Sequence, residues 1–75
     1  MIIHQVKETS FKDKTGNEVH FTKALYETEN DLGVAILKGS SEKIGVIFKA
    51  EKPFECGEMC DIVRQPGKMP RLYIY

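Results

Sequence analysis

The chain alternates apolar and polar residues with a period of two almost throughout, and clusters of turn residues interrupt the alternation about every ten residues. A period of two, with many Val, Ile, Phe and Tyr residues, is typical of β-strands. Turn clusters rich in Gly, Asn, Asp and Pro separate the segments. The pattern predicts an all-β fold, a small antiparallel OB-like barrel of five to six strands. The predicted strands are 2–7, 19–26, 34–37, 44–48, 59–63 and 71–75.

The segment 51–57 breaks this rhythm, because it contains Pro53 and Gly57 and shows no clean alternation. We interpret it as a crossing loop, with room for a single helical turn after Pro53. A sustained period of 3.6 is absent, so no long helix is expected.

The aromatic residues divide between the two faces of the predicted strands. Phe21 and Phe48 are in phase with apolar neighbours and are expected in the core. Tyr26, Tyr73 and Tyr75 have the opposite parity from their apolar neighbours, so they are expected on an exposed face. Such a face can stack bases, although half-exposed tyrosines are also common in strands without a ligand.

A chain of 75 residues is one domain, 1–75. A domain of this size buries only about 60% of its unfolded surface, so its core is marginal on its own. We therefore expect a homodimer. The segment 71–75 is expected to be an uncovered sheet edge.

Eleven basic and eleven acidic side chains give a net charge of zero, which argues against a polyanion binder driven mainly by salt. The charges are nevertheless unevenly spread. Residues 62–75 carry three cations and no acid, and Lys12 and Lys14 lie in one turn. These clusters indicate either a local basic face or ordinary solvated loops. Four cations could track phosphates from strands or strand edges: Lys23, Lys49, Arg64 and Arg71.

Sequence motifs of enzymes are absent, so no catalytic residue is assigned and a non-enzymatic protein is expected. His4 and His20 can each lie near a carboxylate, but nothing in their spacing enforces catalysis. Cys56 and Cys60 form a C-x3-C pair without finger-like spacing to other ligands. We expect free thiols that are dispensable for binding, and neither a metal nor another cofactor. The longest apolar runs are too short to span a bilayer and no leader is evident, which favours a cytoplasmic location, the host cytoplasm if the chain is viral.

The order of features resembles the helix-destabilising single-stranded DNA-binding proteins of filamentous bacteriophages. The turn 11–17 with its lysines is similar to the DNA-binding wing of that family, and 46–49 to an apolar strand that ends in a DNA-contacting lysine. The segment 53–57 resembles the family's Pro-aromatic-Gly crossing, and 67–75 its final hairpin, whose tip reaches the neighbouring subunit's DNA site. The resemblance, together with the charge and aromatic patterns, implies a DNA-binding set of eight residues: Lys12, Lys14, Lys49, Phe54, Lys68, Met69, Arg71 and Tyr73.

The expected function is therefore to coat single-stranded DNA without strong sequence preference, in phage or plasmid replication. Lys49, Arg71 and Tyr73 are expected to line one groove, with Lys12 and Lys14 on a loop that closes over it. An alternative is a phage or plasmid accessory protein that binds another protein through a strand edge or through the acidic stretch 27–31. A further alternative is a subunit of a larger assembly with no site of its own.

Overall fold

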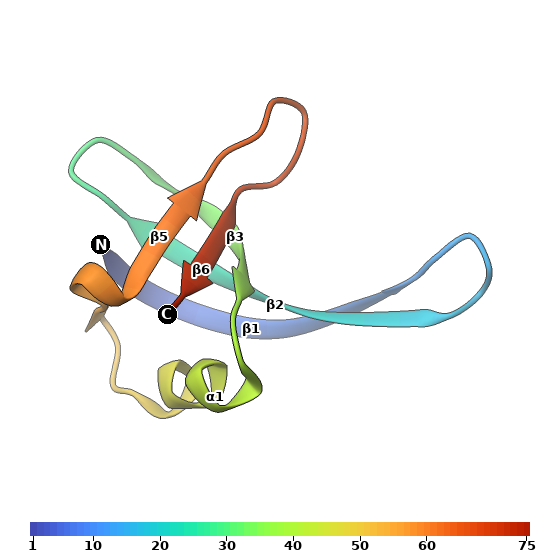
Figure 1. Ribbon diagram of the computed structural model, residues 1–75, viewed down its shortest axis with the longest axis horizontal. Helices are drawn as coiled ribbons and strands as arrows, with labels where there is room; N and C mark the ends of the chain where they lie inside the picture. Colours follow the sequence, from blue (N-terminus) through green and yellow to red (C-terminus); the bar gives the residue numbers. More distant parts are fainter.

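The computed structural model describes all 75 residues as a curled sheet of six strands, one short α-helix and one turn of 3-10 helix (Figure 1). The predicted all-β class is confirmed. The elements, in chain order, are β1 (Ile2–Lys12), β2 (Glu18–Glu27), β3 (Leu32–Lys38), α1 (Ser41–Lys49), β4 (Phe54–Glu55), η1 (Gly57–Met59), β5 (Cys60–Val63) and β6 (Arg71–Ile74).

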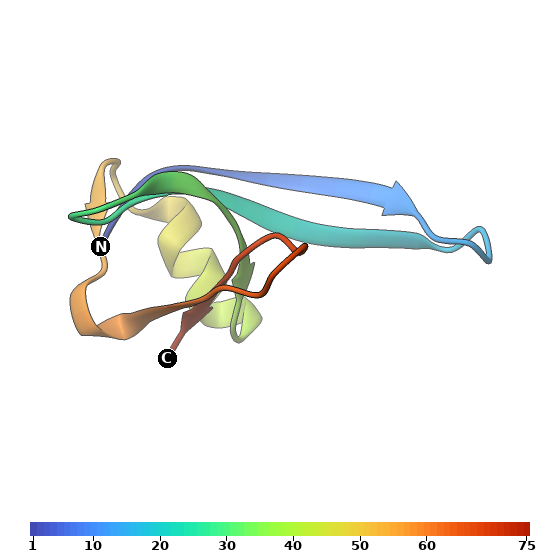
Figure 2. The ribbon, with the colours of Figure 1, turned by 90° about the horizontal axis from the view of Figure 1, so that it is seen from above.

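The strands lie in the order β4-β1-β2-β3-β6-β5. All neighbours are antiparallel except β3 and β6, so the expectation of a purely antiparallel sheet is wrong at this pair. The chain leaves β3 through α1 and crosses back before β5, which brings β6 alongside β3 in the same direction. Because β4 and β5 each have only one neighbour, the sheet stays open, as a partly open OB-like barrel. Figure 2 shows the β1–β2–β3 layer curling over α1 toward β5 and β6.

Residues 44–48 form part of α1, so the strand predicted there is wrong. The Ser40 Oγ accepts a hydrogen bond from the Lys43 N–H (3.2 Å) and caps the first turn, where Glu42 also favours the helix dipole. Ile44 and Ile47 lie one turn apart, and Ile47 is fully buried. A five-residue apolar run is compatible with a buried strand or a helix. Here the N-terminal cap at Ser40 favours the helix.

The crossing segment 51–57 contains no helical turn directly after Pro53. A cis Lys52–Pro53 bond leads into β4, which pairs with Ile2 and Ile3 of β1, and the 3-10 turn follows only after Cys56. The Lys52 Nζ donates to the carbonyl oxygens of Ile47 (2.6 Å) and Ala50 (2.7 Å). This ammonium therefore closes the C-terminal end of α1, where a cation is favoured.

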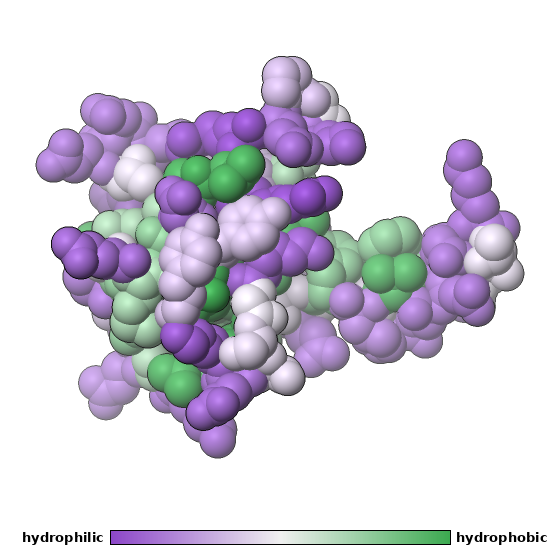
Figure 3. Space-filling view, in the orientation of Figure 1, coloured by the Kyte–Doolittle hydropathy of each residue, from purple (hydrophilic) through white to green (hydrophobic).

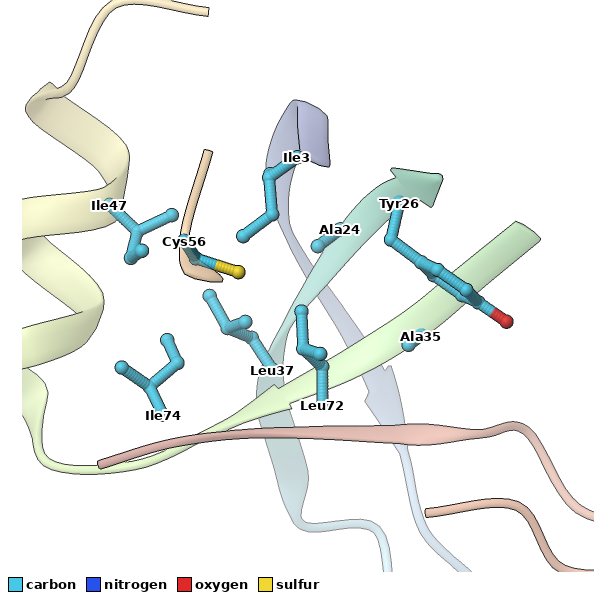
Figure 4. Close-up of a cluster of buried hydrophobic side chains, with 9 residues drawn as sticks. All are labelled: Ile3, Ala24, Tyr26, Ala35, Leu37, Ile47, Cys56, Leu72 and Ile74. Atoms are coloured by element: carbon cyan, nitrogen blue, oxygen red, sulfur yellow. The ribbon is translucent and has the colours of Figure 1, made fainter. Parts of the chain in front are cut away.

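The core is a single cluster between the sheet and α1 (Figure 4). Its largest fully buried side chain is Tyr26, so the expectation that Tyr26 lies on an exposed face is wrong. Gly33 makes room for it, since a Cβ there would lie 3.1 Å from the Tyr26 hydroxyl. The nine core residues are Ile3, Ala24, Tyr26, Ala35, Leu37, Ile47, Cys56, Leu72 and Ile74.

Phe21 lies on the side of β2 that is turned away from the core, so the expectation that Phe21 is a core residue is wrong. Phe48 is also outside the core, at 39% exposure. A bulge at His4 shifts the register between β1 and β2, so Ile3 and Val6 both face the core although they have opposite parity. The simple alternation of 2–7 could not reveal this shift.

The strands β1 and β2 continue well past the sheet as a two-stranded hairpin, residues 8–21, which we call the arm (Figures 1 and 2). It accounts for the 38 Å long axis of the molecule. At its tip, the Asp13 Oδ1 accepts hydrogen bonds from the backbone N–H groups of Thr15 and Asn17, both 3.0 Å, and Gly16 takes a φ of 87°. The turn 11–17 is thus a defined hydrogen-bonded turn. Figure 3 shows a mostly hydrophilic arm with one hydrophobic patch along it.

Segment 71–75 is not an uncovered edge, because β6 pairs with β3 on one side and β5 on the other. Its apolar alternation is explained by burial of Leu72 and Ile74 within the sheet.

Candidate nucleic-acid interface

The side of the sheet turned away from the core, which we call the outer face, is set by strand register. Lys7 of β1 lies opposite Lys23 of β2, Lys23 lies opposite Ile36 of β3, and Ile36 lies opposite Arg71 of β6. Neighbouring strands are about 4.8 Å apart, so this row crosses about 14 Å of sheet from Lys7 to Arg71. Three cations therefore stand in one line across four strands.

The adjacent positions on the outer face add a fourth cation and three aromatic rings. Two acids border them: Asp61 lies opposite Tyr73, and Glu27 lies opposite Leu32. Lys38 lies opposite Tyr73, one row from Ile36 and Arg71. None of the four cations makes an ion pair. The central part of the outer face, from β1 to β6, consists of Gln5, Lys7, Thr9, Phe11, Phe21, Lys23, Leu25, Val34, Ile36, Lys38, Arg71 and Tyr73.

Phe11 lies opposite Val19 and Phe21 lies opposite Thr9, so the two rings are diagonal neighbours on β1 and β2. They form an edge-to-face pair, with ring centroids 5.6 Å apart at 70°. The Lys23 Nζ lies 5.7 Å from the centroid of the Phe21 ring. Phe11 is 52% exposed, so one ring of the pair is open to solvent. The pair gives this end of the outer face a flat apolar surface next to a cation, a combination that can stack a base beside its phosphate.

A shallow open groove of about 170 Å³ runs along the outer face of β1, β2 and β3. Its walls mix the two lysines of the first row with apolar side chains, and no carboxylate lines it. The lining residues are Gln5, Val6, Lys7, Lys23, Leu25 and Val34.

Two of the residues predicted from the sequence lie on the outer face. Arg71 and Tyr73 are half-buried and alternate with buried Leu72 and Ile74, so they point to the same side of β6. Their predicted juxtaposition on one strand face is confirmed.

Three further predicted residues lie in two loops beside this face, and a fourth, Lys12, lies opposite Glu18 on the side of the arm turned away from it. Lys12 ends β1 and Lys14 lies in the tip of the arm, while Lys68 and Met69 lie in the β5–β6 loop. All four are exposed. Figure 1 shows the two loops pointing in different directions, the arm along the long axis and the β5–β6 loop across it. In OB-folds, the corresponding two loops border the oligonucleotide-binding face.

The structure does not bring Lys49 and Phe54 to the outer face. Lys49 is the last residue of α1, which packs on the core side of the sheet through Ile47. Phe54 is half-buried in β4 and packs against the core cluster. The groove expected to join Lys49 with Arg71 and Tyr73 is therefore absent.

Arg64 forms an ion pair with Asp31, unlike the four cations of the outer face. Its Nη2 lies 2.6 Å from the Asp31 Oδ2 and 3.4 Å from the Tyr26 hydroxyl, which itself donates to Asp31 (3.2 Å). The Arg64 hydrogen bond lowers the pKa of Asp31 below its usual value, and Tyr26 and Asp31 together raise the pKa of Arg64. This contact ties the β5–β6 loop to the β2–β3 loop.

Sequence reasoning missed Lys7, Lys38, Phe11 and Phe21 as members of the site. Each lies in an alternating segment, so parity alone leaves two possible faces. The signal that could have found them is the pairing of cations across strands, which requires the register and the His4 bulge.

Cys56 and Cys60 are free thiols beside the N-terminus. Burial, followed by the hydrogen bond with Cys56, raises the pKa of Cys60 to about 12. No three His, Cys, Asp or Glu side chains gather closely enough to hold a metal ion. His20 lies on the arm between Glu8 (3.8 Å) and Glu18 (3.7 Å), exposed to solvent.

No helix in the structure combines the length and the apolar character needed to cross a membrane.

Comparison with protein-family models, with curated proteins and with solved structures finds no match for this chain. The resemblance to the phage proteins therefore stays a prediction.

Proposed function

We propose that this chain binds single-stranded DNA, without strong sequence preference, through the outer face of β1, β2, β3 and β6. The observation that supports this most is the composition of the central part of that face: four unpaired cations and three aromatic rings, with carboxylates, Glu27 and Asp61, at its border. In a chain with equal numbers of acids and bases, such a segregated face suits a polyanion with exposed bases.

The row of cations suggests what the ligand contributes. Lys7 and Lys23 lie directly opposite each other, an arrangement that is unfavourable without a counter-charge between them. A phosphate placed over this pair removes the repulsion and accepts hydrogen bonds from both ammonium groups. Arg71, at the other end of the row, offers a planar guanidinium for a second phosphate.

The aromatic and apolar residues of the outer face suit stacking on the flat faces of bases rather than hydrogen bonding to particular base edges. Phe11, Phe21 and Tyr73 present rings on which any base can stack, and the apolar groove along β1–β3 adds non-directional contact. Cations and rings discriminate poorly between bases, which supports binding without sequence preference. Lys14 and Lys68 in the flanking loops extend the positive charge beyond the sheet.

We further propose that this activity serves phage or plasmid replication in the cytoplasm. The support is the resemblance described above and the two free thiols, which suit a reducing compartment.

The test is a titration of a fluorescently labelled oligo-dT with the protein at several salt concentrations, followed by anisotropy. If all four cations of the outer face contact phosphates, log K should fall with log[salt] with a slope of about −3, from roughly 0.7 for each contact. Lys23→Gln should flatten this slope by roughly 0.7 to 1, whereas Lys43→Gln, which removes the same charge from α1, should not change it.

Two outcomes would contradict the proposal: no binding at low salt, or equal effects of Lys23→Gln and Lys43→Gln. An oligo-rU titrated in parallel reports whether the site distinguishes DNA from RNA through the 2′-hydroxyl.

A further inference from the structure

The outer edge of β1 has no strand beside it over most of its length. On that side β4 covers only Ile2 and Ile3, so residues 5–12 present backbone N–H and C=O groups to no other strand. The other open edge, β5, is four residues long. Long open edges invite pairing with another chain, and short ones resist it.

The arm also lacks support on its second side, because β3 pairs with β2 only from Thr22 onward. An isolated two-stranded ribbon is marginal in water, and this one exposes Phe11 at 52%. A third strand alongside β1 would stabilise the ribbon and cover part of this ring.

We propose that a second copy of this chain supplies that strand: the two β1 edges pair antiparallel about a two-fold axis through Ser10. In this register Glu8 lies opposite the partner's Lys12, and Lys12 opposite the partner's Glu8. Phe11 lies opposite the partner's Thr9. The edge is thus complementary in charge to itself, as an isologous interface requires.

A two-fold axis perpendicular to the sheet keeps residues of equal parity opposite each other, so the neighbouring symmetric registers have Thr9 or Phe11 on the axis. With Thr9 on the axis, Lys12 lies opposite the partner's Val6 and Glu8 opposite the partner's Ser10. With Phe11 on the axis, Lys12 lies opposite the partner's Ser10, and Glu8 meets only Lys14 in the turn beyond β1. The Ser10 register is therefore the one that pairs Glu8 with Lys12 inside β1.

The length of the open edge fits this arrangement. With Ser10 on the axis, residues 8–12 of the two copies pair, and the turn at the tip of each arm lies beside residues 5–7 of the partner. Each β4, which covers Ile2 and Ile3, then lies beyond the partner's tip and does not compete for the edge. A two-fold axis perpendicular to the sheet also places both outer faces on the same side. The proposal does not depend on what that face binds.

Charge variants test the pairing in the full-length protein by sedimentation velocity over a range of concentrations. Lys12→Glu places like charges opposite each other at both symmetric positions and should raise the dimer Kd about tenfold or more. The double variant Glu8→Lys with Lys12→Glu restores both pairs and should recover the wild-type Kd. Lys14→Glu, which makes the same charge change opposite the partner's Val6, is the control and should leave the Kd near the wild-type value.

A Ser10→Cys variant tests the axis directly. Directly opposite residues have Cβ atoms about 4.5–5.5 Å apart, close enough to form a disulfide after a small adjustment. Mild oxidation should give a covalent dimer of Ser10→Cys and none of the wild-type chain, whose own thiols lie away from the arm. A monomeric wild-type chain at all concentrations, or a double variant no stronger than Lys12→Glu, would overturn the proposal.

Discussion

Arg64 illustrates how the neighbours of a side chain decide its role. As a cation in an acid-free stretch of sequence, Arg64 is a candidate phosphate contact. In the structure its guanidinium is 2.6 Å from Asp31, a residue 33 positions away, and it joins two loops. Only the fold brings these two residues together, so their pairing could not be predicted from the sequence.

The Asp31–Arg64 pair gives the protein a specific dependence on acid. The folded state holds the pKa of Asp31 below its usual value, so the pair contributes stability at pH values above the usual range of an aspartate. That contribution is lost as the pH falls through the lowered pKa. Asp31→Asn should therefore lower the urea midpoint at pH 7, and the difference from wild type should shrink toward zero in acid. Asp61→Asn, which removes a carboxylate without an ion pair, should show no such convergence; parallel behaviour of the two variants would contradict the assignment.

Tyr73 is the predicted site residue that the structure keeps on the outer face beside a cation. Tyr73→Ala should weaken oligo-dT binding by about 1–3 kcal/mol, because it removes a stacking surface, with little change in the salt slope. Phe48→Ala removes an exposed ring from α1 and is the matched control. Equal affinities of Tyr73→Ala and the wild-type protein would show that Tyr73 is not part of the interface.

At the scale of elements, helix α1 shows where sequence patterns are ambiguous. The run Ile44–Phe48 suits a buried strand by composition, yet Ser40 and Glu42 supply a helix start. Propensity alone could not settle the choice, since a glycine lies in the middle of the run. By contrast, the alternating segments 2–7 and 19–26 are strands as predicted, although β1 continues to Lys12.

The capping interaction makes a measurable contribution. Ser40→Ala removes the hydroxyl that accepts from the Lys43 N–H and should destabilise the protein by about 1 kcal/mol. Ser41→Ala, at the adjacent exposed position inside the helix, should cost little, because alanine is the better helix former. Urea unfolding followed by circular dichroism compares the two; a larger loss in Ser41→Ala would show that the cap does not hold α1.

The alternation of residues along the sequence divides each predicted strand into two faces, but it does not show which face is buried. The core uses Ala24 and Tyr26 of β2, whereas Phe21 and Leu25, which look more hydrophobic as a set, lie on the outer face. Tyr26 can be buried because Asp31 and Arg64 satisfy its hydroxyl. The bulge at His4 then moves Val6 to the core side and Lys7 to the outer face.

At the scale of the whole molecule, nine buried residues form a small core, and the arm extends beyond it without contributing to it. This division separates the roles of the two parts. The curled sheet with α1 contains the core, while the outer face and the arm expose cations and rings. The total charge of zero hides the row of Lys7, Lys23 and Arg71 across the sheet.

The most direct test of the outer face as the DNA interface is a chemical-shift titration of the 15N-labelled protein with an unlabelled oligo-dT at low salt. If the outer face binds DNA, we expect the largest amide shifts in residues 5–11, 21–25, 34–38 and 71–73. Smaller shifts are expected in the loops that carry Lys14 and Lys68. The amides of α1 and β4 should stay nearly unchanged. Shifts centred on Lys49 and Phe54, or no shifts at any DNA concentration, would contradict binding at the outer face.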